Sequence, residues 1–506
     1  MQKFSKGALV ILFTIIFNFF FWNEKFGINL ILFTVIFGGI LYALNPQEKN
    51  KKETLLAILG ITLASSAVLM HNSFFSKFML FASIFLFVAS IMEKQIKTIY
   101  HLIPSGFLGI ITSPFKKHSF FTFPKTGLSG KSFKWVKISL IPLLITIIFA
   151  IIYSIANPVF ANKLNFFVEN LGDYLSNIFS YYPFTRFIFI GIGLLIGIGV
   201  FYYQTLHLFD DGEFPQAYDL KRIKTKTSIS NTTWKTFNMI ALKTEGSIAV
   251  LTLISLNLLL LFVNLLDLNV FFVQDHAMNS DFSYSLHKGT WVLIFSIILS
   301  SSIVLYIFRG NLNFYAKNKL LKIVTYIWIG QNMILASSVV ARVIHYINHH
   351  GLAYKRIGVV VFIVATGIGL ITLILKVKNK KTISYLLRTN GISIFIILLV
   401  TAFFNWDVII ANHNLNNTNS KNIDYLFELS LSDKTLPILD KNRNKLKARN
   451  HAYKSYSFDF PWVKNQSLTQ RLDSRIKAFE KRYKSQSWLS WNLSDQKTAE
   501  YFKIKK

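Results

Sequence analysis

The chain contains no cysteine among its 506 residues. This absence excludes disulfide bridges, thiolate nucleophiles, zinc–cysteine sites and iron–sulfur clusters. Charge is also scarce, because only 16% of the residues are charged, and the acidic kind is the rarer one, with 24 Asp and Glu against 55 Lys and Arg. A soluble chain of this length carries far more charge. The composition therefore argues against a soluble globular protein.

Hydrophobic residues make up 52% of the chain, and Phe alone occupies 49 positions. They occur in runs of about twenty residues, the length that a helix needs to cross a bilayer core of roughly 30 Å. We therefore expect an all-α integral membrane protein with about eleven transmembrane helices and a small helical extramembrane region at the C-terminal end. The expected spans are 7–22, 26–44, 54–70, 74–92, 138–156, 186–206, 246–265, 289–308, 323–343, 357–376 and 392–410.

These runs divide the chain into four regions. Residues 1–92 form a hydrophobic segment of four helices, and 93–137 form a basic cytoplasmic loop. Within that loop the apolar stretch 101–115 is too short to span a bilayer, so we expect it to be re-entrant or interfacial. Residues 138–411 form a core of seven helices, and 412–506 form a polar extracytoplasmic tail.

Two patterns in the tail predict helices. Apolar residues recur at helical spacing between Leu468 and Tyr483, which indicates an amphipathic helix. Ser494 precedes a second helical stretch and is expected to be its N-cap.

Positive charge is distributed unevenly between alternate loops. Loops on the side of the N-terminus contain 28 Lys and Arg, whereas the short loops and helix ends on the other side contain 8. Cytoplasmic loops carry the excess of Lys and Arg. We therefore expect a cytoplasmic N-terminus and an outer C-terminus.

No motif of a known catalytic or nucleotide-binding site is present: the chain has no Walker loop, HExxH, GxSxG or dinucleotide fingerprint. Gly191, Gly193, Gly197 and Gly199 lie inside one apolar run, which favours close helix packing over a phosphate loop. No cofactor is expected. A membrane-embedded transferase or hydrolase has one acid–base pair to draw on, Asp267 with His287.

Polar side chains inside apolar runs are more informative, because hydrocarbon makes them costly. The predicted topology gathers a polar set at the outer ends of the seventh to ninth spans: Asp267, His287, Arg342, His345 and His349. In one interpretation this set lines a cavity that binds an anionic head group or substrate, and the histidines relay protons or bind a metal. In the other, Arg342 reaches the interface, the histidines are solvated, and Asn and Gln side chains join neighbouring helices.

The stretch "LKIVTYIWIGQNMILASSVVARVIHYINHHGLAYKRIGV" contains a recurrent pattern at Trp328, Asn332, Arg342, Tyr346, Gly351, Leu352 and Arg356. The same pattern extends to Asn257, Asp267 and His287. It also includes residues at the start of the tail: Asn405, Asp407, Asn414, Asp424, Tyr425, Leu426, Ser430, Asp433 and Pro437. Over roughly 205–500 the chain resembles an uncharacterised bacterial membrane-protein family, a domain of unknown function of the four-one-five-three and four-one-seven-three types. Ala353 stands where the family pattern has Thr. The resemblance implies an architecture and marks residues, but it implies no activity.

The resemblance favours a ligand site over a histidine metal site, because it reaches the Asp, His and Arg positions but not His345 or His349, which lack a third ligand. The expected ligand-binding residues are Asp267, His287, Arg342, Asn332, Tyr346 and Arg356. The leading hypothesis is a transporter or a lipid- or solute-handling permease. The alternatives are a structural or sensory membrane protein without a substrate, and the transferase or hydrolase.

The expected location is the bacterial plasma (inner) membrane, and the expected partners are membrane lipids. The basic loops 93–137 and 207–245 are suited to anionic head groups. Nucleic acid is not an expected partner, and the oligomeric state is left open.

Overall fold

The computed structural model describes most of the chain: residues 6–46, 51–93, 96–116, 146, 153, 159–160, 162–166, 184–205, 218–220, 239–273, 280–309, 311–315, 317–416, 423–453 and 467–505. Every named element within these ranges is a helix, and one isolated β-bridge joins Asp219 and Lys381. The expectation of an all-α protein is confirmed for this part of the chain.

Within the described ranges, six helices are long and apolar enough to cross a membrane: Lys52–His71, Phe74–Met92, Leu242–Leu266, Lys319–Asn348, Tyr354–Lys378 and Ile383–Ala402. Shorter apolar helices occupy four other expected spans, at Lys6–Phe21, Ile28–Leu44, Thr185–Phe201 and Leu293–Ile307. The expected span 138–156 lies outside the described residues, apart from 146 and 153. The helices are those of a membrane protein, and the expected number of eleven spans is not confirmed.

The boundaries expected for the last span, 392–410, are wrong. Helix α13 covers Ile383–Ala402, and after a break a separate helix, α14, covers Trp406–Asn416. The indole Nε1 of Trp406 donates to the Thr401 carbonyl at 2.8 Å and stabilises this break. Arg388 lies within α13, where its side chain is buried and its guanidinium lies over the Tyr218 ring, 5.6 Å from the centroid.

The chain divides into two compact units, and the first contains residues 1–65, 80–212 and 486–492. It comprises α1 (Lys6–Phe21), α2 (Ile28–Leu44), parts of α3 (Lys52–His71) and α4 (Phe74–Met92), α5 (Ile99–Thr112), η2 (Ser113–Phe115), α8 (Phe184–Phe201) and η8 (Trp488–Ser490). The close packing predicted for the glycines of α8 is present at Gly193, Gly197 and Gly199, whose Cβ positions meet α1 and α5, whereas Gly191 has no such neighbour.

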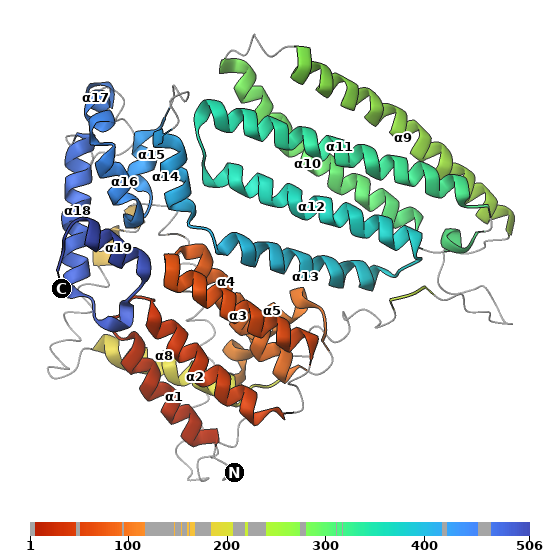
Figure 1. The fold of residues 1–506 in the computed structure, drawn as a ribbon. Helices are drawn as coiled ribbons and strands as arrows, with labels where there is room; N and C mark the ends of the chain where they lie inside the picture. Colours follow the sequence, from red (N-terminus) through yellow and green to blue (C-terminus); the bar gives the residue numbers. More distant parts are fainter. Residues whose placement is uncertain are drawn as a thin grey trace. The chain divides into compact units, whose positions relative to one another are not determined.

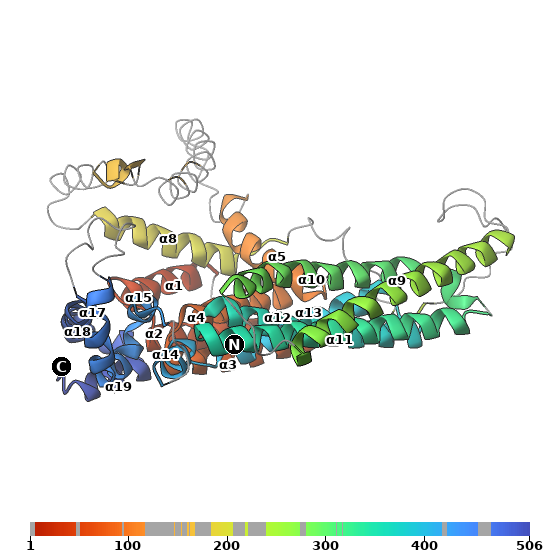
Figure 2. The same cartoon turned by 90° about the horizontal axis from the view of Figure 1, so that it is seen from above.

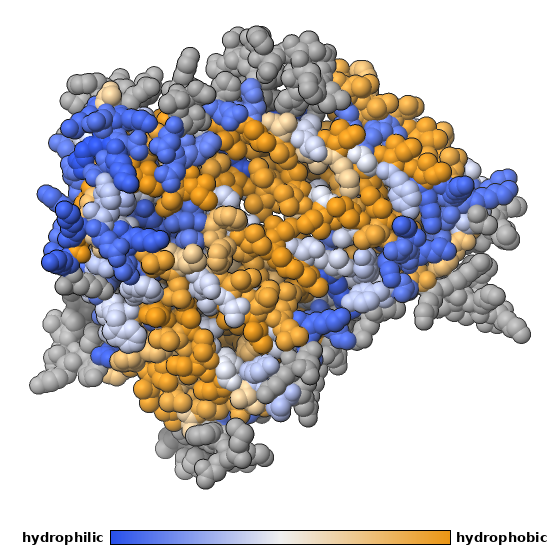
Figure 3. Space-filling view, viewed as in Figure 1, coloured by the Kyte–Doolittle hydropathy of each residue, from blue (hydrophilic) through white to orange (hydrophobic). Residues whose placement is uncertain are grey.

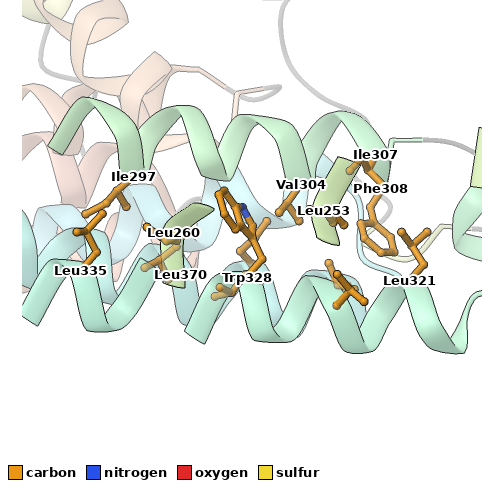
Figure 4. Close-up of a cluster of buried hydrophobic side chains, with 14 of the residues drawn as sticks. Leu253, Leu260, Ile297, Val304, Ile307, Phe308, Leu321, Trp328, Leu335 and Leu370 are labelled. Carbon is orange, nitrogen blue, oxygen red and sulfur yellow. The ribbon is translucent and has the colours of Figure 1, made fainter. Parts of the chain in front are cut away.

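The second unit contains residues 66–79, 213–485 and 493–506. Its apolar bundle consists of α9 (Met239–Val273), α10 (Ser280–Ile307), α11 (Lys319–His350), α12 (Tyr354–Lys378) and α13, with η5 (Asn311–Phe314) between α10 and α11. These helices run side by side in alternating directions (Figures 1 and 2). Their interior is aliphatic around Trp328, as Figure 4 shows, with Leu253, Ile297 and Leu335 at 2% exposure or less.

A C-terminal helical layer, α14 to α19, completes the second unit. It contains α15 (Tyr425–Ser430), η6 (Asp433–Thr435), α16 (Leu436–Lys441), α17 (Arg443–Tyr453), α18 (Leu468–Ser485) and α19 (Leu493–Tyr501). Leu468, Leu472 and Phe479 of α18 are buried in the layer's own core, as their spacing predicts. Figure 3 shows hydrophilic residues over this layer and hydrophobic ones over the bundle.

The N-cap prediction for Ser494 is wrong, because α19 already begins at Leu493. The Ser494 hydroxyl instead donates to the carbonyl of Met70, at the α3–α4 turn, at 2.7 Å. A cap and a tertiary contact use the same hydroxyl, and the sequence pattern does not distinguish them.

Candidate functional site

Helices α11 and α12 are joined by a tight connection, Gly351 to Ala353, which we call the elbow. The amide of Gly351 donates to the Ile347 carbonyl at 2.8 Å and ends α11. Gly351 has a φ of +78°, a region that L side chains rarely adopt. A Cβ at this position would also lie 2.6 Å from Oδ1 of Asn414. Both the backbone angle and the close approach of Asn414 therefore require glycine.

The side chain of Asn414, on α14, binds the elbow backbone on both sides. Its Oδ1 accepts from the Leu352 amide at 2.5 Å, and its Nδ2 donates to the Leu352 carbonyl at 2.9 Å. A carboxamide offers a donor and an acceptor side by side, which matches one extended residue of backbone. Asn414 is 4% exposed, so these bonds are shielded from water. This pair of bonds, the Asn414 clamp, fixes the helical layer to the elbow.

Arg356 and Tyr346 meet on the other side of the elbow. The Arg356 guanidinium donates to the carbonyls of Gly351 and, at 3.0 Å, of His350, and so satisfies the end of α11. It lies over the Tyr346 ring, 4.4 Å from the centroid. Tyr346 in turn stacks on His350, with ring centroids 4.4 Å apart. The three side chains brace the elbow, which is a structural role for two of the predicted ligand residues.

Glu428 lies next to the clamp in α15 and is fully buried. Its Oε1 accepts from Nδ2 of Asn414 at 2.6 Å, whereas its buried Oε2 has no hydrogen-bond partner among the described residues. Burial raises the pKa of the Glu428 carboxyl to about 7; the Asn414 bond lowers it and the charge of Asp424 raises it by smaller amounts. This carboxyl therefore changes its charge near neutral pH.

A second buried carboxylate, Asp407, lies on α14 beside the start of α12. It accepts hydrogen bonds from the hydroxyls of Tyr354 and Ser432. Its Oδ2 lies 3.8 Å from Nζ of Lys434, and the Asp407 and Lys434 side chains are 11% and 8% exposed. Burial lowers the pKa of Lys434, and the charge of Asp407 opposes that shift. This cluster joins α12, α14 and η6 through one carboxylate.

Buried amides join α9 to α11 within the bundle. Nδ2 of Asn257 donates to the Val324 carbonyl at 3.1 Å, and Nε2 of Gln331 donates to Oδ1 of Asn257 at 3.1 Å. Two turns further, Nδ2 of Asn264 donates to the Gln331 carbonyl at 3.2 Å. These bonds support the interpretation that the amides hold helices together. Asn332 binds only within its own helix, through Nδ2 to the Trp328 carbonyl at 2.8 Å.

The structure brings together some of the residues predicted for the ligand site. Tyr346 and Arg356 meet at the elbow, whereas Asn332 precedes Tyr346 by about 20 Å of helical rise along α11. Arg342 and His345 are half-buried on α11. Asp267 lies on α9 and His287 on α10, but their side chains, like that of His349, lie outside the described residues. Within the residues that the structure describes, no group of three His, Asp or Glu could hold a metal.

Sequence reasoning missed Glu428, Ser432 and Lys434. Glu428 lies between Phe427 and Leu429 on a short helix, but neighbouring residues of a helix point in different directions, so this pattern does not predict its burial. Nothing local marks Lys434, because its partner Asp407 lies on a different helix.

A family model described as "Domain of unknown function (DUF4153)" matches residues 54–442, well over half of the chain. The chain belongs to this family. No curated protein and no solved structure matches it. The DUF4153 match begins within α3, earlier than the resemblance suggested, and ends directly after α16. It therefore contains the elbow and every residue that holds the elbow, and it leaves out α18 and α19.

Proposed function

We propose that this protein is a pH-responsive membrane protein of the bacterial plasma membrane, in which a single proton controls how firmly the helical layer holds the elbow. One observation supports this proposal above the others: Glu428 is fully buried, binds the Asn414 clamp through one oxygen, and finds no partner for the other in the part of the chain that the structure describes. A buried acid of this kind is stable when protonated and strained when ionised.

Among the described residues, no cation pairs with Glu428. The charge of Asp424 acts on it and disfavours ionisation. Arg356, at the elbow, is bound to backbone carbonyls. Arg475 of α18 donates to the carbonyls of Leu429 and Leu431 and pairs with Asp433 at 2.9 Å. Ionisation of Glu428 therefore adds an uncompensated charge beside the clamp.

The sign of the pH effect follows from the raised pKa. The folded protein binds the Glu428 proton up to a pH of about 7, whereas the unfolded chain releases it near 4.5. The contribution of Glu428 to the free energy of unfolding is therefore fully present below pH 4.5 and is lost as the pH rises towards 7. The total loss is about 3 kcal/mol.

We expect Glu428→Gln to remove this pH dependence. At pH 8 the helical layer of the variant should be more stable than that of the wild type by about 2 kcal/mol. The variant gains because the amide carries no buried charge, and part of this gain is offset because the amide NH₂ finds no acceptor. Hydrogen exchange of the elbow and α15, corrected for intrinsic rates and compared at pH 5.5 and 8, measures the effect. The exposed Glu500→Gln is the matched control. Equal pH profiles for wild type and Glu428→Gln would refute the proposal.

A solute- or lipid-handling permease is the second candidate, and buried acceptors in the bundle favour it. Oδ1 of Asn264 and Oδ1 of Asn332 are buried, and no donor in the described ranges reaches them. Such oxygens can bind a ligand that carries N–H or O–H donors. Native mass spectrometry of the wild type beside Asn332→Leu and Arg342→Ala tests this function: a small ligand retained by the wild type and lost from folded variants supports it, and a bare wild type argues against it.

The orientation that we propose has a cytoplasmic N-terminus. It places the ends of α10 and α12 and the starts of α9, α11 and α13 on the cytoplasmic side, where the basic residues are. Because the chain has no cysteine, a single cysteine at Lys380 reports the side directly. If a membrane-impermeant reagent added from the outer side labelled this cysteine, the orientation would be the opposite of the one we propose.

A further inference from the structure

Four cations at one end of the bundle lie against aromatic rings. The Arg309 guanidinium lies 3.9 Å from the centroid of the Tyr306 ring, and Nζ of Lys380 lies 5.0 Å from that of Phe314. Nζ of Lys381 lies 5.8 Å from the centroid of the Tyr385 ring. The fourth pair is the buried Arg388 over the Tyr218 ring. Pairs of this kind occur about once per 70–80 residues in proteins. Their concentration at one end of five helices therefore marks a distinct surface.

Backbone and side-chain contacts connect these pairs into one surface. Residues 218–220 pair with 380–382, through Leu220 N to the Lys380 carbonyl at 3.0 Å and Thr382 N to the Tyr218 carbonyl at 2.9 Å. The buried Nζ of Lys376 donates to the Phe308 carbonyl at 3.1 Å, which ties α12 to the end of α10. We call the accessible cations of this surface, Arg309, Lys378, Lys380 and Lys381, the basic rim.

The rim is strongly positive. Ten basic residues lie at this end in the described ranges, against the acids Asp219 and Glu245: Lys243, Arg309, Lys317, Lys319, Lys322, Lys376, Lys378, Lys380, Lys381 and Arg388. The opposite ends of the same helices have four basic residues, Lys288, Arg342, Lys355 and Arg356, against Asp267 and Asp281. The charge is therefore concentrated at one end of the bundle.

Aromatic partners orient a cation without cancelling its charge. A carboxylate would neutralise Arg309 or Lys380, whereas a ring holds the group in place by its quadrupole and leaves the positive charge available to an anion. Asp219 pairs with Lys381 at 2.6 Å but is itself 61% exposed, so its effect is screened. The rim is thus preorganised for a negatively charged ligand.

The position of the rim selects the ligand. It borders α10, α12 and α13 where their apolar stretches end, and Tyr306, 63% exposed, and Tyr218, 45% exposed, lie beside its cations. Tyr rings and cations at helix ends lie at the level of lipid head groups. From this geometry we infer that the basic rim binds the phosphate head groups of anionic phospholipids in the adjacent leaflet. The four rim cations themselves lie outside the loops 93–137 and 207–245, and residues 218–220 of the second loop pair with 380–382 beside them.

Lipid retention in native mass spectrometry tests this inference, with the full chain released from nanodiscs of phosphatidylglycerol and phosphatidylcholine. Arg309→Gln with Lys380→Gln should lower phosphatidylglycerol affinity about thirtyfold, since each basic residue near the surface contributes about fivefold. Tyr306→Leu with Phe314→Leu leaves the charge unchanged and should lower the affinity about fivefold. The exposed Lys355→Gln, at the other end of α12, is the matched control and should change it little.

Three outcomes would overturn the inference. Phosphatidylglycerol retention that is unchanged in the Arg309 and Lys380 double variant, with melting temperature preserved, would show that the rim does not bind lipid. An equal loss in Lys355→Gln would show that only net charge matters. Displacement of the lipid by millimolar inorganic phosphate would identify a soluble anion as the ligand instead.

Discussion

Replacing Asn414 with Ala is expected to release the helical layer from the elbow and to lower the free energy of unfolding of that layer by about 4 kcal/mol. The substitution removes both bonds of the clamp and the bond to Glu428. The amide and carbonyl of Leu352 and Oε1 of Glu428 then remain buried without partners, and each such group costs about 1–3 kcal/mol. The loss exceeds that of an ordinary buried asparagine because three groups depend on one side chain.

Hydrogen exchange at Leu352 and in α15 measures this loss, since local opening exposes these amides before the bundle unfolds. The matched control is Asn412→Ala, which changes the same residue type on the exposed face of α14. Exchange at Leu352 that stays as slow in Asn414→Ala as in the control would show that the clamp does not hold the elbow.

The variant Asn414→Asp distinguishes the effect of the clamp hydrogen bonds from the effect of side-chain packing at this position. The carboxylate keeps the acceptor for the Leu352 amide but loses the donor, and it places a second acid against Glu428. Two carboxyls at this distance share a proton, so one of them has a strongly raised pKa. We expect both variants to gain stability as the pH falls through the raised pKa of Glu428, and Asn414→Asp to gain more than Asn414→Ala, because only Asp adds a second carboxyl that takes up a proton.

Local patterns predicted the parts of the structure that local geometry controls. The spacing of Leu468, Leu472 and Phe479 predicts which face of α18 is buried, because side chains three and four residues apart share a face. The family resemblance marked Tyr346, Gly351 and Arg356 within one short stretch, and the structure brings them together because the chain turns at Gly351. The span expected at 392–410 was wrong at both ends, because α13 begins at Ile383 and the chain breaks before Trp406, where no proline or glycine marks the break.

The contacts that define the candidate site are long-range, and a single sequence does not contain them. Asn414 was a marked residue of the tail and Leu352 a marked residue of the elbow, but nothing in the pattern indicates that one binds the backbone of the other. The same holds for Glu428, whose unusual pKa depends on burial by a layer that packs over it. The proposed roles of Asp267 and His287 stay predictions.

Replacing Asp407 with Ala should destabilise the junction of α12, α14 and η6 by about 3–5 kcal/mol, because it leaves the ammonium of Lys434 buried without its counter-ion. The hydroxyls of Tyr354 and Ser432 lose their acceptor at the same time. Thermal unfolding in detergent measures the change. Glu480→Ala is the control, since it deletes the acid of an exposed ion pair with Lys484, which contributes about 0.5 kcal/mol.

A double-mutant cycle and the pH dependence identify the buried charge as the cause. Asp407→Leu combined with Lys434→Met should recover most of the lost stability, because two apolar groups need no counter-ion. The pKa of Lys434 is lowered by burial, so the folded state binds fewer protons than the unfolded chain between that pKa and its ordinary value, and stability rises with pH in this window. Removing Asp407 widens the window, so the deficit of Asp407→Ala should shrink towards pH 10. A deficit that is constant with pH, or a double variant no better than Asp407→Ala, would assign the loss to packing around α14 and not to the buried charge of Lys434.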